Sequence, residues 1–227
     1  MSIPEWYTGS DLTGKVAAGI EETIENMDEH QAGEEDILLL RDLLAIEDEV
    51  NWKAFLLSLL GTIQYDMGDS DAASGVLEDA LSSYKPYLPS FDGVLSVYCQ
   101  AAYTAGVLLF ETERYEEAVP CLLRCLPYLH EVYDNAYVGD IYTLLNICLG
   151  MIDDMTGSLI FAEAAVFSRN SDCESLENMM VAYFNVGEQA KAIEVFHILS
   201  ERCQDCDHFE RILDFARSNL GETGVVN

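Results

Sequence analysis

One spacing of small and large residues recurs along this sequence and restricts the folds open to it. Ala73, Ala118 and Ala192 are each followed four residues later by a large apolar residue and seven residues later by a small or medium-sized one. In the first copy these residues are Leu77 and Ala80. Positions three and four apart share one face of an α-helix. The spacing therefore predicts helices whose small residues let a neighbouring helix approach closely.

A second part of the pattern lies upstream of the small residue. Gly61 and Gly106 stand twelve residues before the small residue of the first two copies. Asn146 stands at the same offset before Ser158, which opens a weaker copy, and Met180 stands there before the last copy. The first two copies thus share a glycine at this offset, and the last two copies depart from it.

The fullest copy lies between Tyr98 and Leu126, where a helix with small residues is followed by a polar turn and by the tetrapeptide YEEA at 115–118. This arrangement resembles one unit of the tetratricopeptide-repeat family, a two-helix hairpin that stacks on copies of itself. The resemblance implies that the first helix of a unit crosses its partner closely at Gly61 and at Gly106, and Asn146 and Met180 depart from the family pattern at this position. No β-type alternation recurs along the chain. The resemblance implies an all-α, right-handed superhelical solenoid of antiparallel helix hairpins that ends in a C-terminal capping helix.

The predicted helices divide the chain into three parts. Residues 1–50 form an N-terminal helical hairpin that is either a diverged repeat or a cap. Residues 51–203 form four repeat-like hairpins, and residues 204–227 form the capping helix and a short tail. The small residues are spaced 45, 40 and 34 residues apart, whereas the family unit has about 34 residues. The first two units therefore need longer helices or connections.

The charge of the chain excludes several classes of partner. Its 41 acidic and 11 basic residues give a formal net charge of -30. Such a surface repels nucleic-acid phosphates and anionic lipids, so we expect no nucleic-acid partner and no membrane insertion. Three explanations of the acidity stay open: a solvated surface, a site for a basic partner, and an adaptation to high salt.

The seven cysteines are an odd number in a chain whose first residues show no secretory signal. This usage favours reduced thiols and a cytoplasmic location. Cys121 and Cys125 share a helix face, and Cys125 takes a repeat position that packs in the core. We interpret Cys99, Cys148 and Cys173 in the same way, as small hydrophobic residues.

Minor candidates for a zinc site are Cys203, Cys206 and His208. The first two form one CxxC motif, but a second CxxC or a paired HxxxH is missing. We therefore favour buried or idle thiols and expect no metal and no cofactor. The sequence also lacks a glycine-rich phosphate loop, an HExxH motif and a GxSxG elbow, so we expect no enzymatic activity.

The concave groove of such a stack is the remaining candidate site, because proteins of this kind commonly bind partners there. Its predicted lining is aromatic and acidic, which suits a basic or amphipathic protein segment. The groove-facing positions that the resemblance implies are Phe55, Tyr65, Gln100, Tyr103, Phe110, Asp140, Thr143, Glu177 and Phe184.

Three hypotheses about function follow. The first is a non-enzymatic interaction module, an adaptor or assembly subunit that binds a protein segment in this groove; charge reversal at Asp140 and Glu177 should then weaken binding. The second is a structural repeat subunit that self-associates or docks permanently in a larger complex. The third is a zinc-binding domain that uses the CxxC near residue 203. The oligomeric state and the partner stay open.

Overall fold

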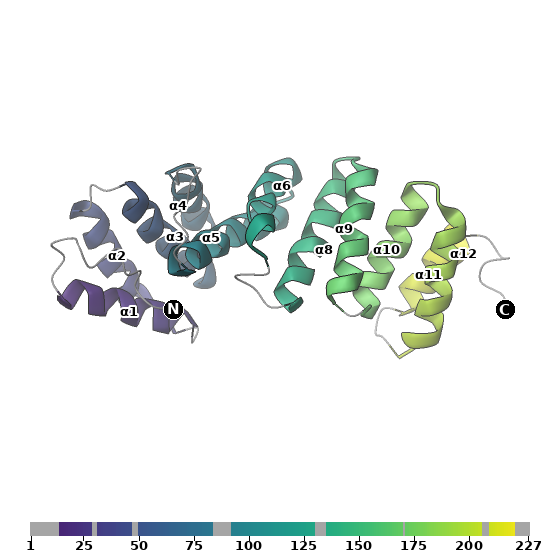
Figure 1. Cartoon of the computed structure of the whole chain (residues 1–227), viewed down its shortest axis with the longest axis horizontal. Helices are drawn as coiled ribbons and strands as arrows, with labels where there is room; N and C mark the ends of the chain where they lie inside the picture. Colours follow the sequence, from purple (N-terminus) through teal and green to yellow (C-terminus); the bar gives the residue numbers. More distant parts are fainter. Residues whose placement is uncertain are drawn as a thin grey trace. The chain divides into compact units, whose positions relative to one another are not determined.

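The computed structural model describes residues 14–28, 31–46, 50–83, 92–129, 135–169, 171–205 and 209–220. Every regular element in these ranges is helical, and none of them is a β-strand. The predicted all-α class is thus confirmed. Figure 1 shows the helices in chain order, and they form two compact units that are described here one at a time.

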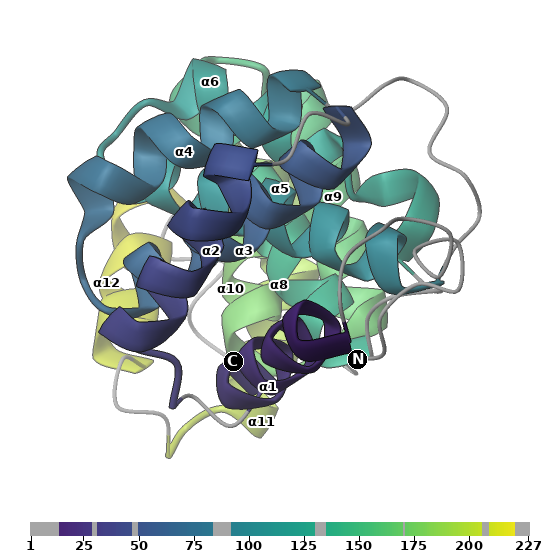
Figure 2. The ribbon, with the colours of Figure 1, turned by 90° about the vertical axis from the view of Figure 1, so that its left-hand side faces the viewer.

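Unit 1 comprises Met1–Glu113 and Pro120–Val132. Its described helical elements are α1 (Gly14–Asp28), α2 (Glu34–Ile46), α3 (Val50–Asp66), α4 (Ser70–Ser83), α5 (Asp92–Glu111) and the 3-10 turn η2 (Leu126–Tyr128). Helix α3 is the centre of this unit, because it packs against α2, α4 and α5 (Figure 2). Its core-facing side chains join those of α1 and α2 in one buried apolar cluster.

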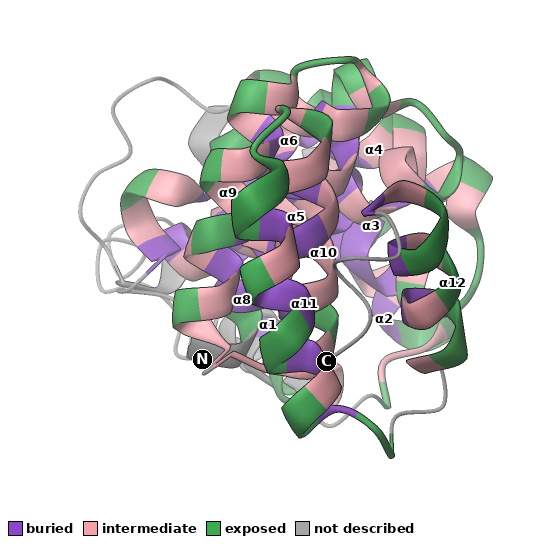
Figure 3. Cartoon of the chain, turned by 90° about the vertical axis from the view of Figure 1, so that its right-hand side faces the viewer, coloured by how far each residue is buried: buried purple, intermediate pink, exposed green. Residues whose placement is uncertain are grey.

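Unit 2 comprises Arg114–Val119 and Tyr133–Asn227, so the boundary at Pro120 divides helix α6 (Tyr115–Leu123) between the units. The other described helices of unit 2 are α8 (Asn135–Met151), α9 (Met155–Ser168), α10 (Cys173–Asn185), α11 (Gln189–Arg202) and α12 (Phe209–Asn219). Helix α8 packs against α9, α9 against α10, and α10 against α11. Buried residues of α10, α11 and α12 share one apolar cluster, and Figure 3 shows the burial along these helices.

Each of the four repeat hairpins turns through one residue with a left-handed backbone. Gly68 and Gly187 both have φ +82°, Glu113 has φ 60° and Asp153 has φ 64°. In each turn the N–H of this residue donates to the carbonyl three residues earlier. All four residues lie five positions before the small residue of their copy. The weaker copy at Ser158 is therefore in register with the other three.

The first two hairpins cross where the sequence predicts it. A Cβ atom added to Gly61 would lie 2.6 Å from Cγ of Leu77, and one added to Gly106 would lie 2.7 Å from Cγ of Leu122. Both leucines are fully buried. The predicted close approach at the two glycines is confirmed, because a methyl group at either position would overlap the partner helix.

The third hairpin crosses through a buried hydrogen bond instead. The hydroxyl of Ser158 donates to Oδ1 of Asn146 at 2.7 Å, and both side chains are buried. Ala162 takes the place that a leucine holds in the first two hairpins, and it is also fully buried. In the fourth hairpin the fully buried Met180 occupies the crossing position. The predicted division of the chain at residues 50 and 203 stays a prediction.

Two glycine-to-alanine substitutions should change stability in opposite directions. Gly106→Ala places a Cβ against the buried Leu122, and we expect a loss of about 1–3 kcal/mol in the free energy of unfolding. Gly75→Ala, in the exposed face of α4, meets no atom within 4 Å, so we expect a gain of about 0.5–1 kcal/mol from helix propensity. Denaturant unfolding measures both.

A double-substitution cycle identifies the cause. Leu122→Ala removes the overlapping side chain, so it should cost less in the Gly106→Ala background than in the parent. Additive effects, or a stabilising Gly106→Ala, would contradict the close approach at this crossing.

Candidate partner-binding face

Tyr65 near the end of α3 and Glu111 at the end of α5 connect two neighbouring helices of unit 1. The hydroxyl of Tyr65 donates to Oε1 of Glu111 at 3.1 Å. Partial burial, this hydrogen bond and the charge of Glu111 raise the pKa of Tyr65 to about 12, with smaller contributions from Tyr103 and Asp66. Tyr65 is therefore a protonated donor, and its hydrogen bond links α3 to α5 at this end.

Three further predicted residues lie along α5 on one side of the helix. Gln100, Tyr103 and Phe110 are three and seven residues apart, which is the helical period, and each is half-buried. Tyr103 is close enough to Tyr65 to affect its pKa. Together with Tyr65 and Glu111 these residues form a partly open aromatic surface with a carboxylate at one end. We call this set of five residues the α3–α5 face.

Two predicted groove residues are core residues, so their assignment to the binding site was wrong. Phe55 is 1% exposed and lies in the apolar cluster of unit 1. Thr143 is 5% exposed, and its hydroxyl oxygen is buried. Neither side chain can touch a partner, because the helices that pack around α3 and α8 cover them.

Asp140 belongs to a cluster of charges around Arg169. The guanidinium of Arg169 lies 3.2 Å from Asp140, 2.6 Å from Asp172 and 3.0 Å from Glu174. Burial lowers the pKa of Arg169, and the three nearby carboxylates raise it, with the largest contribution from Asp172. The carboxylates have the larger total effect, so the pKa of Arg169 is raised above its usual value. A Cβ on Gly139 would lie 2.2 Å from Cγ of this arginine. Because Gly139 has no side chain, Arg169 can pack closely against α8.

Helix α12 approaches the last two predicted groove residues. Arg211 donates to Glu177 at 3.0 Å, and only 15% of the Glu177 side chain is exposed. The ring of Phe184 meets that of Phe215 edge to face, with centroids 5.5 Å apart. Glu177 and Phe184 therefore face the last helix of unit 2, and charge reversal at Asp140 or Glu177 would break an ion pair within the protein.

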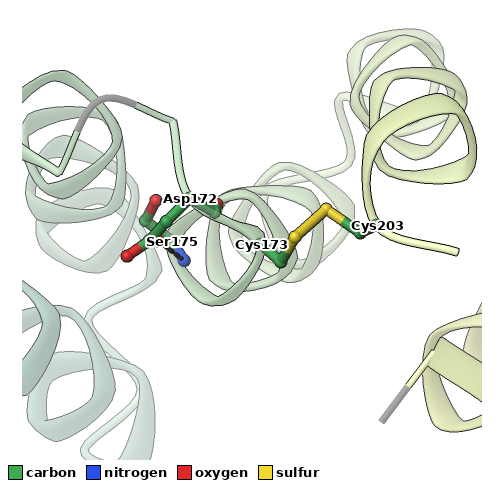
Figure 4. Close-up of a disulfide and its surroundings, with 4 residues drawn as sticks. All are labelled: Asp172, Cys173, Ser175 and Cys203. Atoms are coloured by element: carbon green, nitrogen blue, oxygen red, sulfur yellow. Dashed lines mark hydrogen bonds between the residues drawn. A yellow bond between two sulfur atoms is a disulfide. The ribbon is translucent and has the colours of Figure 1, made fainter. Parts of the chain in front are cut away.

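A disulfide joins Cys173 and Cys203, with an S–S distance of 2.11 Å. Cys173 is the first residue of α10 and Cys203 caps the end of α11, so the bond ties the two free ends of the last hairpin together (Figure 4). The side chain of Asp172 caps α10 by accepting from the backbone N–H of Ser175 at 2.8 Å. The predictions that Cys173 is a small hydrophobic residue and that both thiols are reduced were wrong.

The disulfide also overturns Cys203 as a metal ligand, because its sulfur is already bonded. Cys206 and His208 lie outside the described residues. Within the described ranges, no three side chains of His, Cys, Asp or Glu form a group suited to a metal ion. Cys99, Cys121, Cys125 and Cys148 are not disulfide-bonded. Cys125 is fully buried, and its thiol contacts the backbone oxygen of Cys99 at 3.5 Å, as expected for a core position.

These hairpins in register, with small residues at their crossings, define a tetratricopeptide-repeat-like helical repeat protein. Solved structures share the fold. MamA (residues 41 to the end) from Desulfovibrio magneticus RS-1 has a TM-score of 0.60 at 17% identity, over 86% of this chain and 98% of its own. YrrB, described as a TPR protein with an unusual peptide-binding site, has a TM-score of 0.57 at 18% identity, over 76% and 81%.

The apo form of RapI is similar over 92% of this chain and 78% of its own, with a TM-score of 0.60 and 13% identity. At such identities the likeness shows the fold alone. The sequence matches no protein-family model and no curated protein. In the described part of the chain, we find no helix with the length and apolar character that crossing a membrane requires.

Removing the disulfide should loosen the last hairpin. It closes a loop with a sequence separation of 30 residues, so its loss should lower the free energy of unfolding by about 2–4 kcal/mol. Denaturant unfolding of the oxidised protein is compared with that of the Cys173→Ala/Cys203→Ala variant. A dithiol reductant should destabilise the parent and leave the variant unchanged; equal responses of the two proteins would contradict the assignment.

The hydrogen bond of Tyr65 predicts a dependence on alkaline pH. The pKa is raised from 10.0 to about 12, so the folded state favours the neutral phenol. The resulting stability is complete below pH 10 and is lost as the pH rises towards 12. The difference in unfolding free energy between the parent and Tyr65→Phe should change across this window in favour of the variant. A difference that stays constant would show that Tyr65 titrates alike in both states.

Proposed function

We propose that this protein is a non-enzymatic interaction module, an adaptor or assembly subunit, that binds a protein segment on the α3–α5 face. The observation that carries the proposal is the hydrogen bond between Tyr65 and Glu111, which holds two helices side by side with Tyr103 next to them. A surface fixed before binding loses little conformational entropy when a partner docks.

The chemistry of the face supports a basic or amphipathic segment. Tyrosine and phenylalanine are enriched in the cores of protein interfaces, and Tyr65, Tyr103 and Phe110 are all half-buried. Glu111 is exposed at one end of the face. The net charge of -30 attracts cationic segments over longer distances and speeds their encounter.

The structural neighbours favour a protein partner by analogy. The fold is shared with YrrB, whose description includes a peptide-binding site, and a comparable use of this chain is part of our proposal. A cytoplasmic location also stays a prediction, and the Cys173–Cys203 disulfide removes part of its basis, since two of the thiols expected to be reduced are bonded.

A structural subunit that self-associates or docks permanently is the second candidate function. The exposed ring of Phe167, which is 88% accessible, is the observation that favours it. Light scattering tests self-association, because a stable oligomer has a mass above that of a single chain. The zinc-binding hypothesis is withdrawn for Cys203.

Binding of a flexible peptide composed of lysine, tyrosine and glycine should test the α3–α5 face. We expect fluorescence anisotropy to show binding by the full chain that weakens as salt rises. Tyr103→Ala should weaken it about tenfold, as expected when an aromatic contact in the centre of an interface is removed. Glu111→Gln should weaken it less and should reduce the dependence on salt.

The matched controls are Tyr103→Phe, which keeps the ring, and Glu78→Gln, which removes an exposed carboxylate from α4 in the same unit. Both should bind like the parent. Affinity that is indifferent to Tyr103→Ala and to salt would refute the proposed site.

A further inference from the structure

The outer side of α9 exposes apolar side chains that no described part of the protein covers. The side chain of Phe167 is 88% exposed and Ile160, seven residues earlier, is 58% exposed. Seven residues are two helical turns, so both lie on the same face, with the exposed Glu163 between them. The opposite face of α9 packs inside unit 2 through the buried residues Ser158, Ala162 and Ala165.

The repeat itself shows that this exposure is unusual. Helices α4, α9 and α11 all have 14 residues and share one register. At the positions two and nine residues after the small residue, α9 has Ile160 and Phe167. The counterparts are Gly75 and Ser82 in α4, and Glu194 and Glu201 in α11. All these positions are exposed. At these two positions α4 and α11 have no large apolar residue, whereas α9 has two.

Carboxylates lie near Tyr183, which contacts Glu163 at the centre of the apolar stripe. The hydroxyl of Tyr183, on α10, donates to Oε1 of Glu163 at 2.5 Å. This hydrogen bond, partial burial and the charges of Glu163, Glu188 and Glu194 raise the pKa of Tyr183 to about 12. One cation, Lys191, lies near them, 3.8 Å from Glu188 and 5.2 Å from the centre of the Tyr183 ring. The local potential is therefore negative despite this lysine.

We propose that Ile160, Glu163 and Phe167 of α9 form a second docking surface, whose occupant is an amphipathic helix of another protein with basic residues beside its apolar stripe. The apolar stripe of such a helix covers Ile160 and Phe167, and its lysine or arginine residues meet Glu163 and Glu194. This mode of recognition uses apolar contacts spaced by helical turns and charges that fix the orientation.

Charge complementarity decides between this occupant and a second copy of the chain. Two copies would each bring a net charge of -30, and the stripe would place the Glu163 side chains of both copies next to each other. Like charges at an interface oppose association. A basic helix removes the same apolar surface from water and neutralises the carboxylates at the same time.

The test uses a synthetic amphipathic helix with a leucine stripe flanked by lysines, and the full chain. Ile160→Ser/Phe167→Ser should weaken its binding at least about tenfold in fluorescence anisotropy, because burying a large apolar side chain gives roughly that factor or more. The matched control is Leu38→Ser on α2, where a leucine is 60% exposed. This control should leave the affinity unchanged. Glu163→Gln keeps an acceptor for Tyr183 but removes the negative charge, so the affinity for the peptide should depend less on salt concentration.

Three results would overturn the proposal. The first is equal affinity of the parent and the Ile160→Ser/Phe167→Ser variant. The second is equal binding of a peptide whose lysines are replaced by glutamates. The third is a concentration-dependent dimer of the parent that the variant abolishes in light scattering, which would make the occupant a second copy. Chemical-shift changes centred on α9 would support the proposed surface, and changes confined to α5 would contradict it.

Discussion

The fold depends on how closely two helices of one hairpin approach where they cross. At Gly106 the missing side chain makes room for Leu122, and a Cβ would lie 2.7 Å from its Cγ. The crossing in the third hairpin is packed differently. Ser158 donates a hydrogen bond to Asn146, and the small Ala162 takes the place of a leucine. The residues at a crossing therefore change as a set, since a single replacement leaves either an overlap or an unpaired buried polar group.

The local part of this architecture could be predicted because it is encoded by spacing within one hairpin. The offsets from each small residue give the helices, their turns and the register of the weak copy at Ser158. The residue types of Glu113 and Asp153 did not reveal their left-handed backbone, because neither is a glycine. Phe55 was misassigned for a related reason. Its helix α3 packs against α2, α4 and α5, and the side chain that the resemblance placed in the groove is buried in this packing.

Contacts that depend on the tertiary arrangement of the helices could not be predicted from the sequence. With 41 acidic residues for 11 basic ones, every arginine has many candidate partners, and only the packing selects Asp140, Asp172 and Glu174 for Arg169. The disulfide is similar, because Cys203 has Cys206 three residues away in the sequence but bonds Cys173, at a separation of 30 residues. The antiparallel arrangement of α10 and α11 brings these two ends together. The cysteine nearest in sequence was therefore a poor guide to the bonding partner of Cys203.

The two proposed surfaces differ in whether their residues also make contacts within the folded protein. Tyr65 and Tyr103 are half-buried, so a substitution there changes the contact between α3 and α5 as well as any contact with a partner. Phe167 is 88% exposed and buries little surface in the folded chain, so folding alone gives no reason for an aromatic ring at that position. The strong negative charge makes such a ring tolerable, since repulsion between copies opposes association through it. The same charge favours a basic partner, which is why acidity and the exposed ring are best explained together.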